Sequence, residues 1–572
     1  MTSSGLAPAI TSSDRLALRT LQVGAVAVPL AVTSYKIFEL DRFFLPKELV
    51  VHLCAALCAA LCIGRRPLPA SVAGARPIGG GEPFLSARPV SQGLTWVDLA
   101  LVLFLALSLA SCFAAPNPWL AARALSISLA GAALFWSARH LATRGIGDQV
   151  VAIAGAACAI AAATSLLQAY GVRTDFFSLN RAPGGTFGNR NFVAHLSAIG
   201  GPLLVYTVLR ARGVPGALGA ALGLAATTAA LVLSRSRGAY LATAASIPPL
   251  AIGLWRAGKL PGARPGVMRA AMLAAAIGVG AAGALTVPNT LNWKTNSDNP
   301  YLESVRGVVD YRSGSGKGRL KQYTNSVKMT AAHPLLGVGT GNWSVRYPRY
   351  APDGDPSLVD GNMTANPWPS SDWVAVLSER GPAALLALGG VLLGLAVWAH
   401  AAAWRARQAE EALAGGVLGA TLLATVVVGT FDAVILLAAP AFVAWTAFGA
   451  LAERSGSPTM AGRVLRPPRG LRRLGALALA LLLIASAVRS LGQTIAMGLF
   501  STGNASAIAM AARLDPGSYR VRVRQAEIAS GRRRCEAALA ARSLYPEADA
   551  ARRLASGCRR PTSTARRRAG GA

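Results

Sequence analysis

Apolar segments of about 20 residues recur along most of the chain, and short polar stretches separate them. A helix of that length crosses the hydrocarbon core of a bilayer. The pattern therefore predicts an all-α protein, a polytopic transmembrane helical bundle of about 12–13 helices, with a large outward loop and a small C-terminal helical-repeat domain. The expected helices are 20–38, 47–64, 96–115, 119–138, 149–170, 191–210, 215–233, 239–255, 270–287, 381–400, 411–430, 433–451 and 474–496.

Composition agrees with a lipid environment for most of the chain. Hydrophobic residues make up 53% of the 572 residues and charged residues only 14%, whereas a soluble domain has about a quarter charged residues. The formal net charge of +32 would suggest a nucleic-acid partner in a soluble protein. Here the basic residues lie mainly in short runs between apolar segments, which suits anionic lipid headgroups. We therefore expect contact with membrane lipid and no nucleic-acid partner.

The basic runs also predict an orientation, because cytoplasmic loops carry an excess of lysine and arginine. With the N-terminus inside, every strongly basic loop falls on the cytoplasmic side, including the run from Arg454 to Arg473. The loops 171–190 and 288–372 then face outward. The expected division is a cytoplasmic N-terminus (1–19), nine helices (20–287) with a flexible cytoplasmic linker (65–95), a large outward loop (288–372), four further helices (373–496) and an outward helical tail (497–572).

Four polar stretches interrupt the Ala- and Leu-rich background, and all lie on the outward side of the expected fold. Glycines in them let the backbone turn and approach a ligand closely. In the first stretch, Asn189, Arg190 and Asn191 lie at the start of an expected helix, where an anion can bind. In the second, Arg235 and Arg237 lie on the outward side, against the positive-inside rule. The stretches are Gly184–Phe192 (with Asn189, Arg190 and Asn191), Ser234–Gly238 (with Arg235 and Arg237), Arg319 with His333–Asn342, and Pro369–Gly381 (with Asp372 and Glu379).

In this order, the four stretches resemble the O-antigen ligase and polymerase superfamily of bacterial membrane proteins. That family has an FGNxN-like segment, an SRG segment, an arginine before a PLLGxGxGN segment, and an HN…ExG segment. The resemblance covers roughly residues 20–455. The matching positions are Phe187–Asn191, Ser236–Gly238, Arg319 with Pro334–Asn342, an altered version at Ser370–Gly381, and Phe431–Asp432 followed by Pro440, which looks like the family's late helix.

The resemblance implies a metal-independent glycosyltransferase reaction without a cofactor. Family members move a glycan from an undecaprenyl-diphosphate carrier to an acceptor at the periplasmic face of the bacterial inner membrane, as ligases or as polymerases. The N-terminus would then be cytoplasmic and the C-terminus periplasmic. A diphosphate leaving group gathers negative charge, which arginine can bind through paired hydrogen bonds. By resemblance, the first candidates for binding the diphosphate are Arg237 and Arg319, and the further candidates are Arg181, Arg190 and Arg235. The resemblance also suggests Asn189, Asn191 and Asn342 as substrate-binding residues.

The chain departs from the family at the residue expected to deprotonate the acceptor. The family has a histidine there, whereas this sequence has Ser370, and a serine with an ordinary pKa cannot act as a general base near neutral pH. Asp372 or Glu379 could serve if burial raises its pKa; alternatively, each is a charge at a helix N-terminus. We expect His333 and His195 to be structural residues.

Three functions therefore stay open at the level of the sequence. The first is an active glycan transferase, a ligase or a polymerase. The second is a non-catalytic relative that binds the lipid-linked glycan and scaffolds polysaccharide assembly. The third is a transporter, although the helices carry few of the deep charged residues that a transporter uses.

The C-terminal tail is amphipathic, and residues 509–554 indicate short helices separated by turns. Their spacing resembles one to two tetratricopeptide repeats, whose period is about 34 residues and which usually bind protein partners. Generic helical hairpins that cap the membrane domain are the alternative. Cys535 and Cys558 flank the turn at Tyr545–Pro546 at similar distances. An antiparallel helix pair would bring them to one level, where a disulfide is expected outside the cytoplasm.

Overall fold

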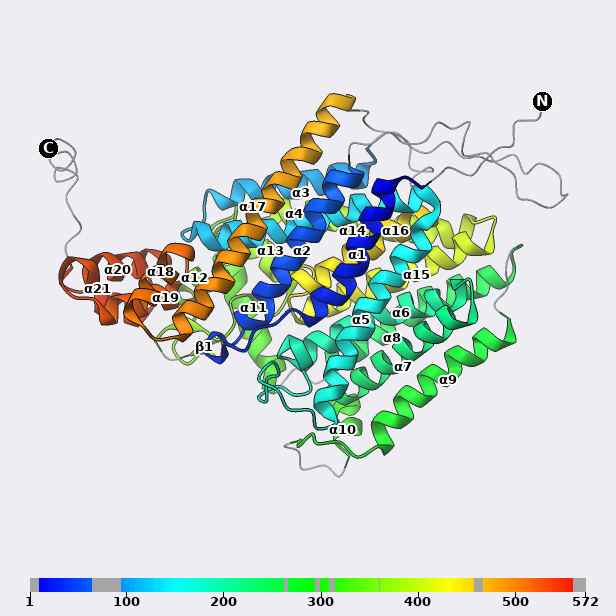
Figure 1. The fold of residues 1–572 in the computed structure, drawn as a ribbon, viewed down its shortest axis with the longest axis horizontal. Helices are drawn as coiled ribbons and strands as arrows, with labels where there is room; N and C mark the ends of the chain where they lie inside the picture. The colour runs from blue at the N-terminus through cyan, green and yellow to red at the C-terminus, as the bar shows by residue number, and fades with distance from the viewer. Residues whose placement is uncertain are drawn as a thin grey trace.

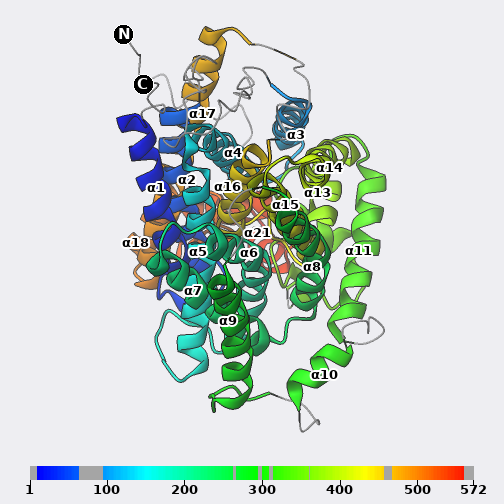
Figure 2. The same ribbon diagram turned by 90° about the vertical axis from the view of Figure 1, so that its right-hand side faces the viewer.

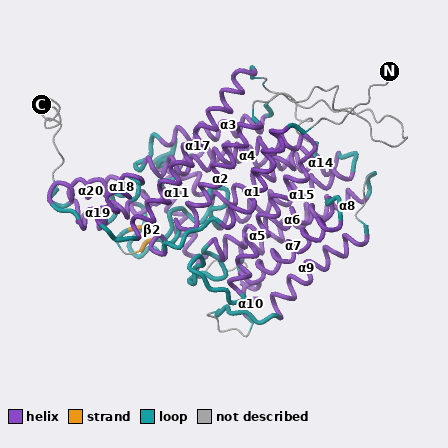
Figure 3. Tube along the Cα trace, viewed as in Figure 1, coloured by secondary structure: helices purple, strands orange, loops and turns teal. Residues whose placement is uncertain are grey.

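The computed structural model describes residues 10–63, 94–261, 266–293, 299–307, 314–359, 361–456, 465 and 467–558. Most of the expected linker 65–95 lies outside these residues, as do short parts of the expected loop 288–372. Within the described ranges the chain is mostly helical, and its one sheet is a pair of short antiparallel strands (Figure 3). The prediction of an all-α fold is confirmed.

The long helices follow the apolar segments predicted from the sequence, one helix for each segment. Nine helical stretches of the described residues are long and apolar enough to cross a membrane, and one of these, Pro118–Ala169, contains two consecutive helices. The chain is therefore a multi-pass membrane protein. The long helices are α1 (Ser12–Leu30), α2 (Asp41–Cys62), α3 (Trp96–Cys112), α4 (Pro118–Leu141), α5 (Gly147–Ala169), α6 (Arg190–Arg210), α7 (Val214–Ser234), α8 (Arg237–Gly258), α9 (Val267–Thr286), α14 (Pro382–Arg405), α15 (Ala409–Phe431), α16 (Ala438–Arg454) and α17 (Arg469–Ser501).

The first helix begins earlier than its apolar residues suggest. The Thr11 hydroxyl accepts a hydrogen bond from the Asp14 backbone N–H, and the Asp14 carboxylate accepts one from the Thr11 backbone N–H. This capping box satisfies two backbone donors that a helix start leaves unpaired. α1 therefore starts at Ser12 rather than near residue 20, and the apolar residues after Leu30 leave the helix as an extended connection.

Central helices of the bundle are surrounded by helices whose apolar faces point outward. α6 and α16 run through the middle, whereas α9 and α17 lie at opposite edges (Figures 1 and 2). α16 is buried along almost its whole length. By contrast, Val279 on α9 and Leu474 on α17 are more than half exposed. A membrane would supply the apolar surroundings that these edge residues require.

The helices α8 and α15 approach each other through facing glycines. A Cβ atom added to Gly416 would lie 2.5 Å from the Cα atom of Gly253, and the reverse distance is 2.6 Å. Small residues let helix backbones approach in this way in membranes, where packing replaces the hydrophobic effect as the driving force. The pair matters for the site because α8 begins, and α15 ends, at the same end of the bundle.

That end of the bundle carries most of the short elements, and we call it the loop end. Its helix α10 contacts α8, and α11 runs along the edge of the bundle beside α13 (Figure 2). The two strands form a hairpin between α12 and α13. The elements of the loop end are α10 (Pro300–Arg306), α11 (Gly314–Ala332), α12 (Trp343–Arg346), β1 (Leu358–Val359), β2 (Met363–Thr364) and α13 (Asp372–Arg380), with the short helices Lys36–Phe38, Gly185–Phe187 and Tyr347–Arg349.

The tail forms four successive helices that project beside the bundle at the loop end (Figure 1). A disulfide joins Cys535 to Cys558, with their Cα atoms 5.4 Å apart. The Asn362 side chain donates to the Glu547 carbonyl, so that the tail contacts the turn of the β1–β2 hairpin. Whether these helices are tetratricopeptide repeats stays a prediction. The tail helices are α18 (Ala505–Leu514), α19 (Tyr519–Ile528), α20 (Gly531–Leu544) and α21 (Asp549–Ala555).

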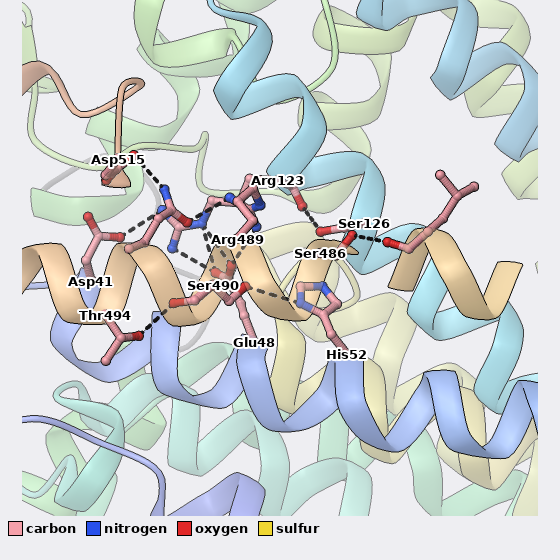
Figure 4. Close-up of polar contacts among 12 residues, drawn as sticks. Asp41, Glu48, His52, Arg123, Ser126, Ser486, Arg489, Ser490, Thr494 and Asp515 are labelled. Carbon is pink, nitrogen blue, oxygen red and sulfur yellow. Dashed lines mark hydrogen bonds and ion pairs between the residues drawn. The ribbon is translucent and has the colours of Figure 1, made fainter. Parts of the chain in front are cut away.

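A buried ionic network joins α2, α4 and α17 close to the tail (Figure 4). The Arg123 guanidinium donates to Glu48 at 2.7 and 2.9 Å and to Asp41 at 2.8 Å. Arg489 lies 3.6 Å from the same Glu48 carboxylate, whose side chain is 3% exposed. One helical turn further along α17, the Gln493 side chain donates to the carboxylate of Asp515, which follows α18 in the tail (3.1 Å). Because buried charges are stable only when paired, this network fixes α17, and with it the tail, against the bundle.

Candidate substrate cavity

Two adjoining cavities open at the loop end of the bundle. The larger has a volume of about 1200 Å³ and the smaller about 820 Å³. They share part of their walls, so we treat them as the larger and smaller lobes of one site. The shared wall includes Arg181, Asn189, Asn191, Arg319 and Ser370.

The larger lobe is strongly basic. Six arginines line it, whereas Glu303 is its single carboxylate among the described residues. Because guanidinium groups stay charged at any physiological pH, the lobe attracts an anion with several negative oxygens. The six arginines are Arg173, Arg181, Arg190, Arg235, Arg237 and Arg319.

The Asn189 segment reaches the cavity because a tight loop precedes α6. The Asn189 side chain caps α6 by accepting a hydrogen bond from the Asn191 backbone N–H at 3.0 Å. Gly188 has a φ of 70°, and a Cβ atom there would lie 2.3 Å from the Phe43 ring. Only glycine fits such a position. The buried Lys47 ammonium group on α2 fixes this loop by donating to the Thr186 carbonyl at 2.9 Å.

Arg235 and Arg237 flank the turn between α7 and α8. Arg235 ends α7 in the left-handed conformation, with a φ of 55°. Its side chain donates to the Ser304 hydroxyl at 2.7 Å and lies 3.1 Å from the Glu303 carboxylate, both on α10. Arg237 starts α8 and donates to the Gly307 carbonyl at 2.8 Å. α10 therefore holds both side chains at the wall of the larger lobe.

Arg319 lies on α11 and lines both lobes. Within the described part of the chain, neither Arg319 nor Arg181 donates a side-chain hydrogen bond to the protein. Each guanidinium has five N–H donors. Both side chains interact electrostatically with Asp432, which follows α15 and lines the smaller lobe. Two arginines at the shared wall thus keep their donors available for a ligand.

Asp432 is the cavity carboxyl with a marked change in acidity. Burial raises its pKa to about 6, and the nearby charges of Arg319 and Arg181 oppose the rise. Among the described residues, its carboxylate accepts one hydrogen bond, from the backbone N–H of the next residue, Ala433. It therefore combines a raised basicity with an accessible position. The sequence resemblance places Asp432 in the family's late helix and assigns it no role.

Asp372 and Glu379, the carboxylates considered as bases from the sequence, line neither lobe. Asp372 accepts hydrogen bonds from the Val434 and Ile435 backbone N–H groups at 2.9 and 3.1 Å. Burial raises its pKa to about 7, although those bonds oppose the rise. Its hold on this segment is also the reason why α16 starts at Ala438 rather than near residue 433. The contacts of Asp372 are those of a residue that shapes the loop end.

Glu379 and Asn342 organise the PLLGxGxGN segment. The Glu379 carboxylate accepts from the Gly341 and Trp343 backbone N–H groups at 2.8 and 3.1 Å, and burial raises its pKa. The Asn342 amide pairs with the backbone of Asn117, accepting at 2.7 Å and donating at 3.0 Å. Asn342 is fully buried and lines neither lobe. The motif thus connects α13 to the start of α4 rather than facing a substrate.

Ser370 lies where the family resemblance expects a histidine, and it lines both lobes. Its backbone N–H donates to the Gln322 side chain at 2.6 Å, and its carbonyl accepts from the Tyr323 hydroxyl at 2.7 Å. The position therefore faces the site while lacking an imidazole. His195 also lines the larger lobe and is 2% exposed, and its Nδ1 atom has no hydrogen-bond partner among the described residues.

Trp293 is a cavity residue that the sequence did not single out. Its ring lies 4.7 Å from the Arg190 guanidinium carbon and 4.9 Å from that of Arg235, measured to the ring centroid. A lone tryptophan after an apolar segment resembles the interfacial tryptophans of many membrane proteins, so its sequence context does not mark it. Its neighbours come from α6 and α7, which only the fold brings together.

The fold and the cavity together define a class, a multi-pass helical membrane protein with an arginine-lined cavity at one end of its bundle. A family model described as O-Antigen ligase matches residues 222–389. The matched region runs from within α7 to within α14 and contains Arg235, Arg237, Arg319 and Ser370. The match supports the O-antigen ligase family and a general role in glycan transfer or polymerisation. No curated protein matches the chain.

Proposed function

We propose that the protein transfers a glycan from an undecaprenyl-diphosphate carrier to an acceptor, or polymerises it, at the periplasmic face of the bacterial inner membrane. The observation that carries this proposal is the larger lobe, whose described lining includes six arginines and one carboxylate. Three of those arginines lie in the region that matches the O-antigen ligase family. A lipid-linked diphosphate is the anion that a membrane protein of this family would meet there.

The arginines have a defined task in such a reaction. The acceptor oxygen forms a bond to the anomeric carbon of the glycan while the bond from that carbon to the phosphate oxygen breaks. The lipid diphosphate leaves with the bonding electrons, so its negative charge grows in the transition state. Donors placed beforehand around that charge stabilise the transition state more than the ground state. Arg237 and Arg319 suit this role, with Arg181 beside them.

Asp432 suits the remaining task, which is to accept the proton of the acceptor hydroxyl. A carboxyl with a pKa of about 6 is mainly ionised at neutral pH and is a stronger base than an ordinary aspartate. It lines the smaller lobe beside Arg319, which lines both lobes. We therefore propose that the donor diphosphate occupies the larger lobe and the acceptor enters the smaller one.

Replacement of each arginine tests the proposal. Arg237→Ala and Arg319→Ala, in cells that lack the natural protein, should reduce the surface glycan on a gel by at least about tenfold, because each removes a charged contact to phosphate. The matched control is Arg212→Ala, an exposed arginine in the turn between α6 and α7. Normal glycan levels in both cavity variants, at normal protein levels, would count against the proposal.

Ser370 favours a second candidate, a non-catalytic relative that binds the lipid-linked glycan and scaffolds polysaccharide assembly. The residue at this wall of the cavity has no imidazole to accept a proton. The two candidates differ in turnover. Purified protein that binds undecaprenyl-diphosphate-linked glycan and never releases undecaprenyl diphosphate would support the second candidate. Release that depends on Asp432 would exclude it.

A further inference from the structure

Trp293 contacts two arginines that belong to different helices. Arg190 is the first residue of α6, Arg235 is the C-cap of α7, and Trp293 belongs to the segment after α9. All three residues line the larger lobe. Each guanidinium carbon lies within 5 Å of the indole ring centroid, well inside the range of a cation–π interaction.

The two arginines differ in their other support. Arg235 is also held by Ser304 and Glu303 on α10. Arg190, by contrast, donates no side-chain hydrogen bond and forms no ion pair with any described residue. The positive charges of Arg235 and Arg181 act on it from nearby. Without the ring, like-charge repulsion and side-chain entropy would turn this guanidinium away from the lobe.

We propose that Trp293 is a positioning residue, which fixes the Arg190 guanidinium, and secondarily that of Arg235, for binding a sugar-linked diphosphate. The inference rests on the proposed function and deepens it. A carboxylate could also fix an arginine, but it would neutralise the charge and occupy the donors that a phosphate needs. An aromatic face holds the planar guanidinium and leaves its N–H groups free. Preorganised donors bind an anion more tightly because less freedom is lost on binding.

The chain offers variants that separate the ring from its N–H group. The indole N–H of Trp293 is buried and has no hydrogen-bond partner among the described residues. Trp293→Phe therefore keeps the aromatic face and removes only an unpaired donor, whereas Trp293→Leu removes the face. Arg190→Lys keeps the charge and loses the planar group. Trp255→Leu is the matched control, since it removes a ring that contacts Lys259 at 3.9 Å, far from the cavity at the opposite end of α8.

The test measures the affinity of the full-length protein in detergent for undecaprenyl diphosphate by thermophoresis. We expect Trp293→Leu and Arg190→Lys each to raise the dissociation constant about threefold to tenfold, and Trp293→Phe and Trp255→Leu to change it less than twofold. The double variant Trp293→Leu with Arg190→Ala should bind less than about twofold more weakly than Arg190→Ala alone, because the remaining partner of the ring, Arg235, is also held by Ser304 and Glu303. In transfer assays the loss should fall on KM for the donor more than on kcat.

Several results would overturn the inference. These are unchanged affinity of Trp293→Leu, weakened affinity of Trp293→Phe equal to that of Trp293→Leu, or additive losses in the double variant. Arg190→Lys guards against misfolding, since it leaves the tryptophan in place. If Arg190→Ala, Arg237→Ala and Arg319→Ala all bind undecaprenyl diphosphate normally, the proposed function fails. If these weaken binding and Trp293→Leu does not, only the role of Trp293 fails.

Discussion

Replacing Asp432 by asparagine perturbs both the stability and the chemistry of the site, in opposite directions. Burial raises the pKa of this carboxyl from 3.8 to about 6. A rise of about two units corresponds to about 3 kcal/mol against the ionised form. Because the residue is partly exposed at the cavity wall, we discount this to about 1–2 kcal/mol for solvent screening.

The sign follows from comparing the folded and unfolded chains. The folded protein has the higher pKa, so it binds this proton more tightly than the unfolded chain does. The cost of ionising Asp432 is therefore absent below about pH 4, grows between about pH 4 and 6, and is complete above that. Asp432→Asn has no charge to bury. At pH 7 it should be more stable than the wild type by about 1–2 kcal/mol, and should unfold at a higher temperature in detergent.

The same variant should lose glycan transfer. Removal of a general base costs about 10² to 10⁴ in rate. The wild-type rate should fall below about pH 6, by about tenfold per pH unit, as Asp432 becomes protonated. The measurement is the release of undecaprenyl diphosphate from the lipid-linked glycan, in membranes that contain the natural acceptor, between pH 5 and 8.

Ser370→Ala is the control, since it changes the same cavity wall without removing a charge. It should keep both the rate and the pH profile. An Asp432→Asn protein with normal activity and an unchanged acidic limb would refute the role of Asp432. A variant that is inactive and also less stable than the wild type would instead indicate a structural residue.

Three further predictions concern the fold that carries the site. Glu48→Ala leaves the largely buried Arg123 and Arg489 without their shared partner, and should lower stability by about 3–5 kcal/mol in thermal unfolding. Glu536→Ala, which breaks an exposed pair with Arg532, should cost no more than about 0.5 kcal/mol. Gly416→Ala should lower the unfolding temperature because its Cβ atom would meet Gly253 at 2.5 Å, whereas Gly389→Ala, with no atom within 4 Å, should not; equal effects would contradict the packing argument. In intact cells an impermeant maleimide should label Asn292→Cys and spare Arg212→Cys, and the reverse result would invert the proposed orientation.

Local sequence patterns predicted the helices well because each membrane helix is determined by its own apolar residues. They also indicated part of the cavity wall, although Asn342, Asp372 and Glu379, which the sequence names as well, line neither lobe. The Asn189 segment, the Arg235–Arg237 turn and Arg319 were named from the sequence, and all of them line the larger lobe. Basic side chains are costly to place in lipid. Their positions between apolar segments therefore indicate where the polar cavity of the protein lies.

The carboxylates were harder to interpret, since their partners are distant in sequence. Asp372 binds backbone N–H groups some 60 residues later, as its bonds to Val434 and Ile435 show. Glu379 binds groups nearly 40 residues earlier, at Gly341 and Trp343. No local pattern predicts such contacts. Sequence patterns do not indicate Trp293 for the same reason, because Arg190 and Arg235, the arginines that contact its ring, are distant in sequence.

The contrast among Asp372, Glu379 and Asp432 gives a physical criterion for choosing between them. Asp372 accepts three backbone hydrogen bonds and Glu379 accepts two, from segments that they connect. Such a carboxylate holds its segment in place, and a transferred proton would weaken those bonds. Asp432 has one backbone bond, to its own neighbour, and two arginines that compensate its charge without fixing it. It alone can gain a proton without loosening the loop end, so its replacement should affect turnover while the fold persists, whereas Asp372→Ala should first displace the start of α16.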